Sequence, residues 1–409
     1  MARGAIDGAR ATPGQTAALY AGAAALRLAL FTLLPTLPDL LTGRVEISTP
    51  VTSFKRLQEG LFLYNHNVSP YDGGVYHQAP LLLPLFSLLP SNAGFPIFTY
   101  LLYTAVDLLS ARALWRIADS GEAGSSALFT SPRRAKRWSG FVIAAVFLFN
   151  PFTVATCLGR STSVFTTCAI LHAIARAVSG APFGAMAALS FASYLSMYPL
   201  LLLPPLILLG YDRQRPERAV KSALAFAAVC VATVSGILAV LFQMSYLVTG
   251  SWEFLASTYG MFDSFRSFFL AVFWLHLSSY VGGLTVRIRR QPLVVLTLLL
   301  GILSIFKPYP SIGDTALFFA LVPLYRHVFP LMRYTFLGAS VILYATCLGP
   351  AFYHLWIYAG SGNANFFYAI TLVWNLGLSL LVCDLMFAVL RDEWEVERPE
   401  MVGKEVRQI

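Results

Sequence analysis

Long apolar runs with at most one charge are the feature that most limits what this chain can fold into. The runs Ser139–Cys157, Ser222–Val248 and Phe366–Leu390 are each long enough to cross roughly 30 Å of hydrocarbon as a helix, at about 1.5 Å per residue. Charged residues make up only 12% of the chain, whereas a soluble domain carries about 25%. The sequence therefore predicts an all-α, polytopic membrane protein.

Short basic connections between the runs indicate the orientation, because Lys and Arg concentrate on the cytosolic side of membrane proteins. They place both ends of the chain in the cytosol. The net charge of +9 thus reflects orientation and does not indicate nucleic-acid binding. The basic connections are the N-terminus with Arg3 and Arg10, Arg112–Arg137, Arg213–Lys221, Arg287–Arg290, Arg326–Arg333 and the tail from Arg391.

Counting crossings between these connections gives about twelve transmembrane segments. The connections before and after 184–210 are both assigned to the cytosol, so this segment must cross the membrane twice. We therefore expect two short helices broken near Met197–Pro199, where proline removes a backbone donor. Residues 1–409 should form one membrane domain, with an outside loop over 36–93 and a cytosolic tail over 391–409. The other spans are expected at 16–35, 94–117, 139–156, 162–178, 222–248, 265–285, 292–306, 315–328, 332–353 and 366–390.

This topology places the chemically unusual segments on the non-cytosolic side. Scattered segments that gather at one end of a helix bundle predict a cavity that opens to that compartment. The segments are Leu63–Pro80, Asn150–Pro151, Arg160–Ser163, Tyr198–Pro199, Trp252–Tyr259, Phe306–Asp314 and His354–Asn365.

The stretch Trp356–Tyr368, WIYAGSGNANFFY, joins the last two apolar runs. Its small residues and its two amides, Asn363 and Asn365, carry no charge and are flanked by aromatic side chains. Buried amides in a membrane protein need partners, so this cluster predicts a ligand site or a subunit contact.

The turn Phe306–Asp314 combines Lys307 with two prolines that stop the preceding helix and an acid that opens the next one. Asp314 is expected to cap the new helix. Lys307 has two interpretations: an interfacial pair with Asp314, or a partner for a lipid phosphate.

The outside loop contains apolar residues at helical spacing over Ser53–Asn65, which predicts an amphipathic helix at the interface. Asp72 precedes two glycines and is expected in an Asx-type turn, with a catalytic base as the alternative. His77 either assists a proton transfer or bonds the backbone. Asn67 begins a formal glycosylation sequon, followed directly by Pro70 after Ser69.

Ionisable residues within or beside the spans are expected to pair structurally, because a lipid-facing charge costs about 2.5–3.5 kcal/mol at the bilayer centre. They are Arg27, Asp107, Arg160, Arg176 and Asp384. The five cysteines lie in apolar runs without CxxC spacing, which argues against a disulfide framework, a metal site or a thiolate nucleophile. No cofactor motif is present in the sequence.

Four strings resemble the PIG-U family, a subunit of the glycosylphosphatidylinositol (GPI) transamidase. The resemblance runs over nearly the whole chain in the same order, and the last string is the most specific. The strings are Phe54–Phe86, Asn150–Phe165, Ile305–Leu324 and His354–Leu372.

The resemblance implies a multi-pass protein of the endoplasmic reticulum membrane with a fold similar to GT-C glycosyltransferases. It also implies a non-catalytic role beside a separate caspase-like catalytic subunit and other membrane partners. In the family, the amides that match Asn363 and Asn365 are associated with holding the GPI lipid. We therefore expect these amides, with Tyr358 and Ser361, to bind the donor in the lumen, while Trp356 and Tyr358 anchor at headgroup depth.

One departure from the family lies at Gly260, which runs directly into Met261 where family members normally carry an aromatic luminal stretch of about 20 residues. On the cytosolic side, Arg218 and Lys221 have two interpretations: contacts with anionic phospholipid, or solvated residues that set orientation.

Three functional classes compete. A lipid-binding scaffold is favoured by the amide cluster and by the lack of a nucleophile. A dolichol-phosphate-sugar-dependent mannosyltransferase would use Asp72. A transporter would show inverted repeats, and the hydropathy shows none.

Overall fold

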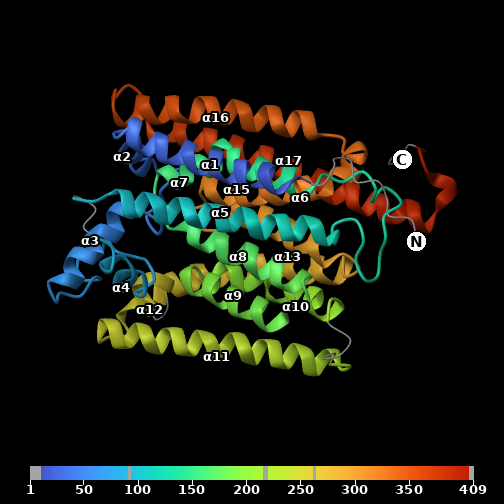
Figure 1. The fold of residues 1–409 in the computed structure, drawn as a ribbon. Helices are drawn as coiled ribbons and strands as arrows, with labels where there is room; N and C mark the ends of the chain where they lie inside the picture. Colours follow the sequence, from blue (N-terminus) through green and yellow to red (C-terminus); the bar gives the residue numbers. More distant parts are fainter. Residues whose placement is uncertain (1–10, 91–93, 215–219, 261–263, 405–409) are drawn as a thin grey trace.

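The described part of the chain is helical throughout, which confirms the all-α prediction. The computed structural model describes residues 11–90, 94–214, 220–260 and 264–404. Within them the only strand-like pairing is one isolated bridge between Ser125 and Thr130. Figure 1 shows the long helices running side by side as one bundle.

Five of the described helices are long and apolar enough to cross a membrane. A sixth span is possible by length if α6 and α7, which bend by 53° at Asn150, count as one. Twelve crossings are therefore not confirmed, since the apolar helices Ser163–Val178, Pro182–Leu195, Tyr198–Asp212 and Pro292–Phe306 are shorter. The five long helices are α1 (Pro13–Leu33), α5 (Ile97–Ser120), α11 (Ala223–Thr249), α16 (Thr335–Ile357) and α17 (Ala364–Glu397).

Polar caps and prolines set the breaks between the shorter helices. Asn150 accepts a hydrogen bond from Phe152 N at 2.9 Å, and Pro151 then starts α7. The expected break in 184–210 is confirmed, since α9 ends at Leu195 and η1 begins at Tyr198. The shorter helices are α6 (Gly140–Phe149), α7 (Pro151–Leu158), α8 (Ser163–Val178), α9 (Pro182–Leu195), η1 (Tyr198–Leu202), α10 (Leu203–Asp212) and α14 (Pro292–Phe306).

The segment expected as one span over 315–328 is divided. It forms α15 (Ile312–Leu321) and then the 3-10 helix η3 (Val322–Leu331), in which Tyr325 departs from helical dihedrals. Pro323 and Pro330 remove backbone donors from this stretch, which explains the break. The helix α13 (Ser264–Arg287) precedes α14.

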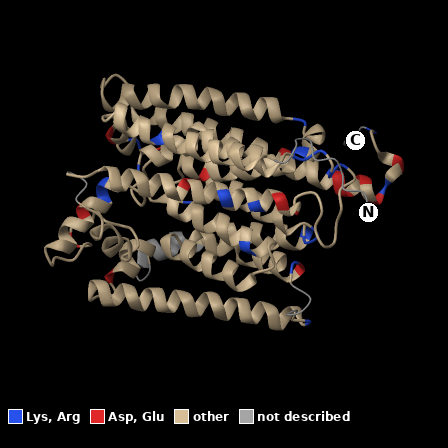
Figure 2. Cartoon of the chain, in the orientation of Figure 1, with Lys and Arg blue, Asp and Glu red and all other residues tan. Residues whose placement is uncertain are grey.

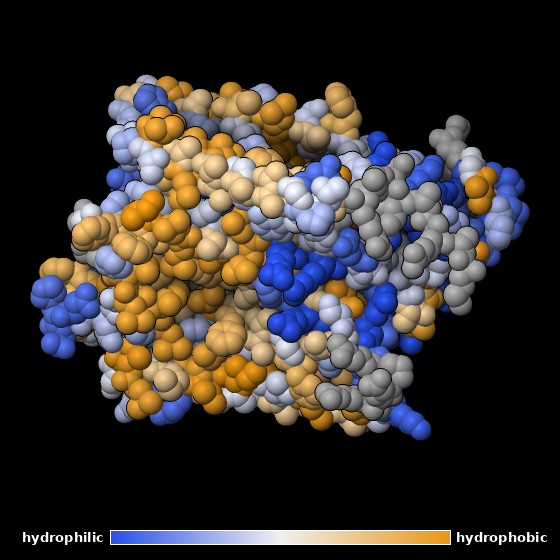
Figure 3. Space-filling view, in the orientation of Figure 1, coloured by the Kyte–Doolittle hydropathy of each residue, from blue (hydrophilic) through white to orange (hydrophobic). Residues whose placement is uncertain are grey.

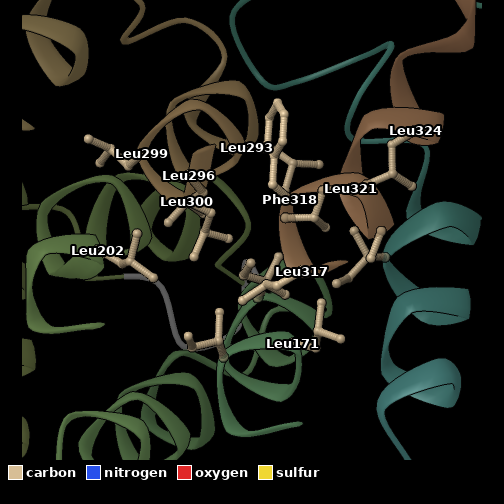
Figure 4. Packing of buried hydrophobic residues seen from close by; sticks show 14 of the residues in the cluster. Leu171, Leu202, Leu293, Leu296, Leu299, Leu300, Leu317, Phe318, Leu321 and Leu324 are labelled. Atoms are coloured by element: carbon tan, nitrogen blue, oxygen red, sulfur yellow. The ribbon is translucent and has the colours of Figure 1, made fainter. Parts of the chain in front are cut away.

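The centre of the bundle is α14, which is buried from Pro292 to Ser304. Its leucines pack with α15, α8 and η1, as Figure 4 shows for Leu296, Leu317 and Leu171. A helix that is apolar all round needs such enclosure. In contrast, α11 and α16 lie at opposite margins of the bundle and expose apolar side chains such as Leu224 and Phe336.

The two ends of the bundle differ. At one end lie α2 (Leu37–Thr42), α3 (Phe54–Asn65), α4 (Leu82–Ser87), α12 (Glu253–Tyr259) and the turn between α16 and α17. Charged residues gather at the other end, where α17 finishes (Figure 2), and on the visible face the apolar residues lie mainly on the side of the first end (Figure 3). The assignment of these ends to lumen and cytosol stays a prediction.

The last helix is longer than the sequence predicted. The expected span ends at Leu390, whereas α17 continues to Glu397. Arginines hold the extension: Arg133 pairs with Asp392 at 2.6 Å and Arg290 with Glu397 at 2.6 Å. The short helix η4 (Pro399–Met401) follows.

Candidate functional site

The predicted outside loop is a packed cap over one end of the bundle. Its α3 buries Phe54, Leu57 and Gly60 and exposes Lys55 and Glu59, so the amphipathic prediction is confirmed. A Cβ on Gly60 would lie 2.6 Å from the Tyr76 ring, which shows how closely the following chain covers this helix. The cap therefore shares a hydrophobic core with parts of α1, α5 and α7, and this core is distinct from the main core of the bundle.

A cavity of about 420 Å³ lies beneath this cap. It gathers residues from the cap, α8, the α9–η1 break, α12, α13, α14 and α15, so several of the segments predicted to share one end do meet there. Its size falls within the range of small-ligand pockets. Polar lining residues include Arg56, His77, Thr162, Ser257, Lys307 and Asp314, and apolar ones include Ile170, Trp274, Leu300, Leu303 and Leu317.

Lys307 and Asp314 form the pair that the sequence suggested. Lys307 Nζ lies 2.5 Å from Asp314 Oδ1. The other carboxylate oxygen accepts hydrogen bonds from Ser311 N and Ser311 Oγ, at 2.8 and 2.9 Å, so the predicted cap at the start of α15 is confirmed. The carboxylate is thus occupied on both oxygens.

His77 bonds the backbone, in line with the second interpretation of this residue. Its Nδ1 lies 2.9 Å from Ser257 O and its Nε2 3.0 Å from Gly74 O, so it ties the cap to α12. Asp72 is exposed, and the side-chain contact at its turn comes from Ser69, whose Oγ accepts from Tyr71 N. The expected Asx turn is therefore made by a serine.

The turn between α16 and α17 carries the predicted donor-binding residues and is exposed, which corrects the expectation of buried amides. Asn363 caps α17: its Oδ1 accepts a hydrogen bond from Asn365 N at 3.0 Å. Gly360 has φ 63°, and a Cβ on Gly362 would lie 3.2–3.3 Å from Leu355 and Trp356. The small residues are thus needed for a tight reversal, and the amides at this turn are exposed.

Asn365, Tyr358 and Ser361 are also exposed at this turn, and Tyr358 has 67% of its surface accessible. An aromatic cluster supports them. Trp356 stacks on Phe367 with centroids 6.1 Å apart, and Arg44 lies 4.0 Å above the ring of Tyr353. Exposed aromatic groups next to amides suit the boundary between lipid and water.

The turn and the cavity are separate, since none of the four predicted donor-binding residues lines the cavity. The strap between α2 and α3 connects the two regions. Arg44 contacts Tyr353 beside the turn, and Ile312 N, at the start of α15, donates to Glu46 O at 2.8 Å. This link joins segments far apart in sequence, and no local pattern signals it.

The basic residues suggested for phospholipid contact have different positions. Lys307 lines the cavity. Lys221 is exposed just before α11, and its carbonyl accepts from Tyr211 Oη at 2.9 Å. Arg218 lies outside the described residues.

The ionisable residues of the apolar segments pair largely as expected. Arg27 bonds Asp107, Arg160 bonds Asp39, and Asp384 accepts from Tyr334 N at 2.8 Å. Arg176 is exposed at the end of α8. The five cysteines are unpaired, and the residues that the structure describes hold no group of three metal ligands.

Comparison with known proteins identifies the family. The sequence model of the GPI transamidase subunit PIG-U matches residues 21–261 and 259–374. The two matched parts meet where the sequence predicts a missing segment; residues 261–263 themselves lie outside the described part. The alignment with the human relative described below extends over 412 positions but includes only 91% of the 409 residues of this chain. That relative therefore has residues that have no counterpart in this chain.

Relatives from yeast and animals match nearly end to end. The chain is 35% identical to the GPI transamidase component GAB1 of Saccharomyces cerevisiae, over 91% of this chain and 94% of that protein. It is 32% identical to the human GPI-anchor transamidase component PIGU, over 91% and 93%. The chain therefore belongs to the PIG-U family of GPI transamidase subunits.

Proposed function

We propose that this chain is a non-catalytic subunit of the GPI transamidase, which binds the GPI lipid donor and presents it in the lumen of the endoplasmic reticulum. The observation that carries the proposal is the exposed turn with Tyr358, Ser361, Asn363 and Asn365, in a chain whose relatives are named as transamidase components. Both chain ends would face the cytosol.

The turn suits an amphiphilic donor. Only the backbone NH of Asn365 takes part in the N-cap of α17. Its exposed side-chain amide is therefore available to donate to a phosphate and to donate to or accept from a glycan. Tyr358 would rest at headgroup depth beside it. Holding the donor's amine near an acyl-enzyme lowers the entropic part of the barrier without supplying a reacting group.

A partner chain would then make the bond. The caspase-like subunit implied by the family would carry the nucleophile, and this chain would supply position alone. Its twelve-span, GT-C-like architecture belongs to the same proposal. Contacts of Arg218 and Lys221 with anionic phospholipid stay a prediction.

The mannosyltransferase alternative has less support. Its proposed base, Asp72, is exposed at a turn and does not line the cavity. None of the relatives described above is named as a glycosyltransferase.

The test compares two single variants in cells that lack the native subunit. Asn365→Ala removes an exposed amide that makes no side-chain hydrogen bond within the described residues, and Asn363→Ser removes an amide but keeps a capping oxygen. Complex assembly and surface GPI-anchored protein are scored separately. We expect normal assembly with reduced anchoring for both. Normal anchoring in both variants would exclude these amides from donor binding.

A matched control uses Thr371→Ala on the same helix. Thr371 is half-buried, and its hydroxyl donates to the local carbonyl of Tyr368 at 2.7 Å. This variant should anchor normally, since it removes a polar group outside the turn.

A further inference from the structure

We infer that the cavity beneath the cap is a second lipid site, which takes a phosphate-bearing membrane lipid with a hydroxylated headgroup, of the phosphatidylinositol class. This site is separate from the exposed turn, and the inference does not rest on the donor-binding proposal.

The cavity is amphiphilic, as a lipid site must be. One part is formed by the apolar side chains Leu300 and Leu303 of α14, Leu317 of α15 and Ile170 of α8. Trp274 of α13 adds a flat apolar surface and stacks on Tyr198, with ring centroids 5.6 Å apart. An acyl chain would lie against these groups, because burial of apolar surface is favourable by about 25 cal/mol per Å².

The other part of the cavity favours an anion. Among the described residues, its charged side chains and histidine are Arg56, Lys307, Asp314 and His77. Asp314 is engaged by Lys307 and Ser311, and both His77 nitrogens face carbonyl oxygens. In the described part of the lining, two cations therefore accompany one acid that is already bonded, so this part carries an excess of positive charge.

Both cations retain donors for a ligand. Lys307 uses one of its three N–H groups on Asp314. Arg56 donates from Nη1 to Val75 O at 3.2 Å, and among the described residues no acidic side chain pairs with it. Charge-assisted bonds from such groups to phosphate oxygens are stronger than neutral hydrogen bonds.

Hydroxyl groups line the same region and favour a hydroxylated headgroup; Thr162 and Thr258 already donate to Gln78, so they offer acceptor oxygens. Thr162, Ser163, Thr166 and Thr167 come from the start of α8, and Ser257 and Thr258 from α12. Side-chain hydroxyls both donate and accept, so they suit a polyhydroxylated ring better than a choline group, which offers no donors.

The test measures thermal unfolding of the purified full-length chain in detergent with added lipid. Phosphatidylinositol should raise the midpoint, whereas phosphatidylcholine and inorganic phosphate should have little effect. Lys307→Gln and Arg56→Gln should each weaken the apparent affinity by about tenfold, the loss expected for one charged hydrogen bond. An equal effect of phosphatidylcholine, or of phosphate alone, would overturn the proposal.

Matched variants separate the cavity from the rest of the surface. Lys55→Gln removes one positive charge from the exposed face of α3 and should leave the stabilisation by phosphatidylinositol unchanged. Thr166→Phe fills the cavity and should abolish this stabilisation, while Asn365→Ala at the turn should not alter it. If the Lys55 and Arg56 variants weaken binding equally, the effect is surface charge and the cavity assignment fails.

Discussion

Arg27 and Asp107 form a buried ion pair between α1 and α5: Arg27 Nε donates to Asp107 Oδ2 at 2.8 Å, and both side chains are almost inaccessible. The two residues stand 80 positions apart. Arg27 Nη1 also donates to Ala23 O at 3.3 Å, whereas Arg27 Nη2 is buried without a hydrogen-bond partner. The pair places opposite charges together where hydrocarbon could solvate neither.

Breaking this pair should unfold the contact between α1 and α5. Asp107→Ala leaves a buried arginine without its counter-ion, which we expect to cost about 3–5 kcal/mol. The double change Arg27→Met with Asp107→Leu removes both charges and should recover most of that loss. Thermal unfolding in detergent measures both. Equal destabilisation of the single and double variants would show that packing volume matters here and charge does not.

The last hairpin depends on a close approach of backbones. A Cβ on Gly377 of α17 would lie 2.7 Å from Ile342 Cγ1 and 3.2 Å from Gly338 O of α16. Gly377→Ala should therefore separate the helices and cost about 1–3 kcal/mol. Gly349→Ala on α16 meets open space and serves as the control. Limited proteolysis between α16 and α17 compares the two, and equal cleavage would contradict the prediction.

Local sequence patterns predicted most helix positions but few of the contacts. The length of the apolar runs predicted α1, α5, α11, α16 and α17, because a helix that crosses a membrane needs an apolar composition. The charges within these runs predicted that Arg27 and Asp107 pair structurally, but not that they pair with each other. That partnership depends on which helices pack together, and single-sequence patterns carry no such information.

The candidate site shows the same limit. The string around Asn363 was found from its residues, but its exposure was not. The sequence interpretation treated its amides as buried, whereas Asn363 and Asn365 are exposed at a tight turn that Gly360 and Gly362 permit. The lining of the cavity by Arg56 was missed, because only the folded cap brings α3 to α14 and α15.

Glu122 should make stability depend on pH. Burial raises its pKa to about 7, although the paired Arg213 guanidinium opposes this rise. The native state therefore holds this proton more tightly than the unfolded state, whose carboxyl titrates at its ordinary value of 4.5. The resulting stability is fully present below that value and is lost as the pH rises through about 7.

Between about pH 5.5 and pH 8 this loss should reach about 2 kcal/mol. Glu122→Gln removes the titrating group, so its free energy of unfolding should change less over this pH range than that of the natural chain, by this amount. Identical pH profiles for the two proteins would refute the role of Glu122.

Variants of Asn363, the N-cap residue of α17, can distinguish a loss of structure at the exposed turn from a loss of donor binding. Asn363 Oδ1 accepts from Asn365 N, so Asn363→Ala should free that first turn at a cost of about 1 kcal/mol. Asn363→Ser and Asn363→Asp keep a capping oxygen and should not. Hydrogen exchange of the amides at Asn365 and Phe366 reports this directly, and we expect about fivefold faster exchange in the alanine variant alone. If the serine variant exchanges as fast as the alanine variant, the cap does not hold the turn, and a loss of anchoring in Asn363→Ser would reflect disorder instead of a missing donor contact.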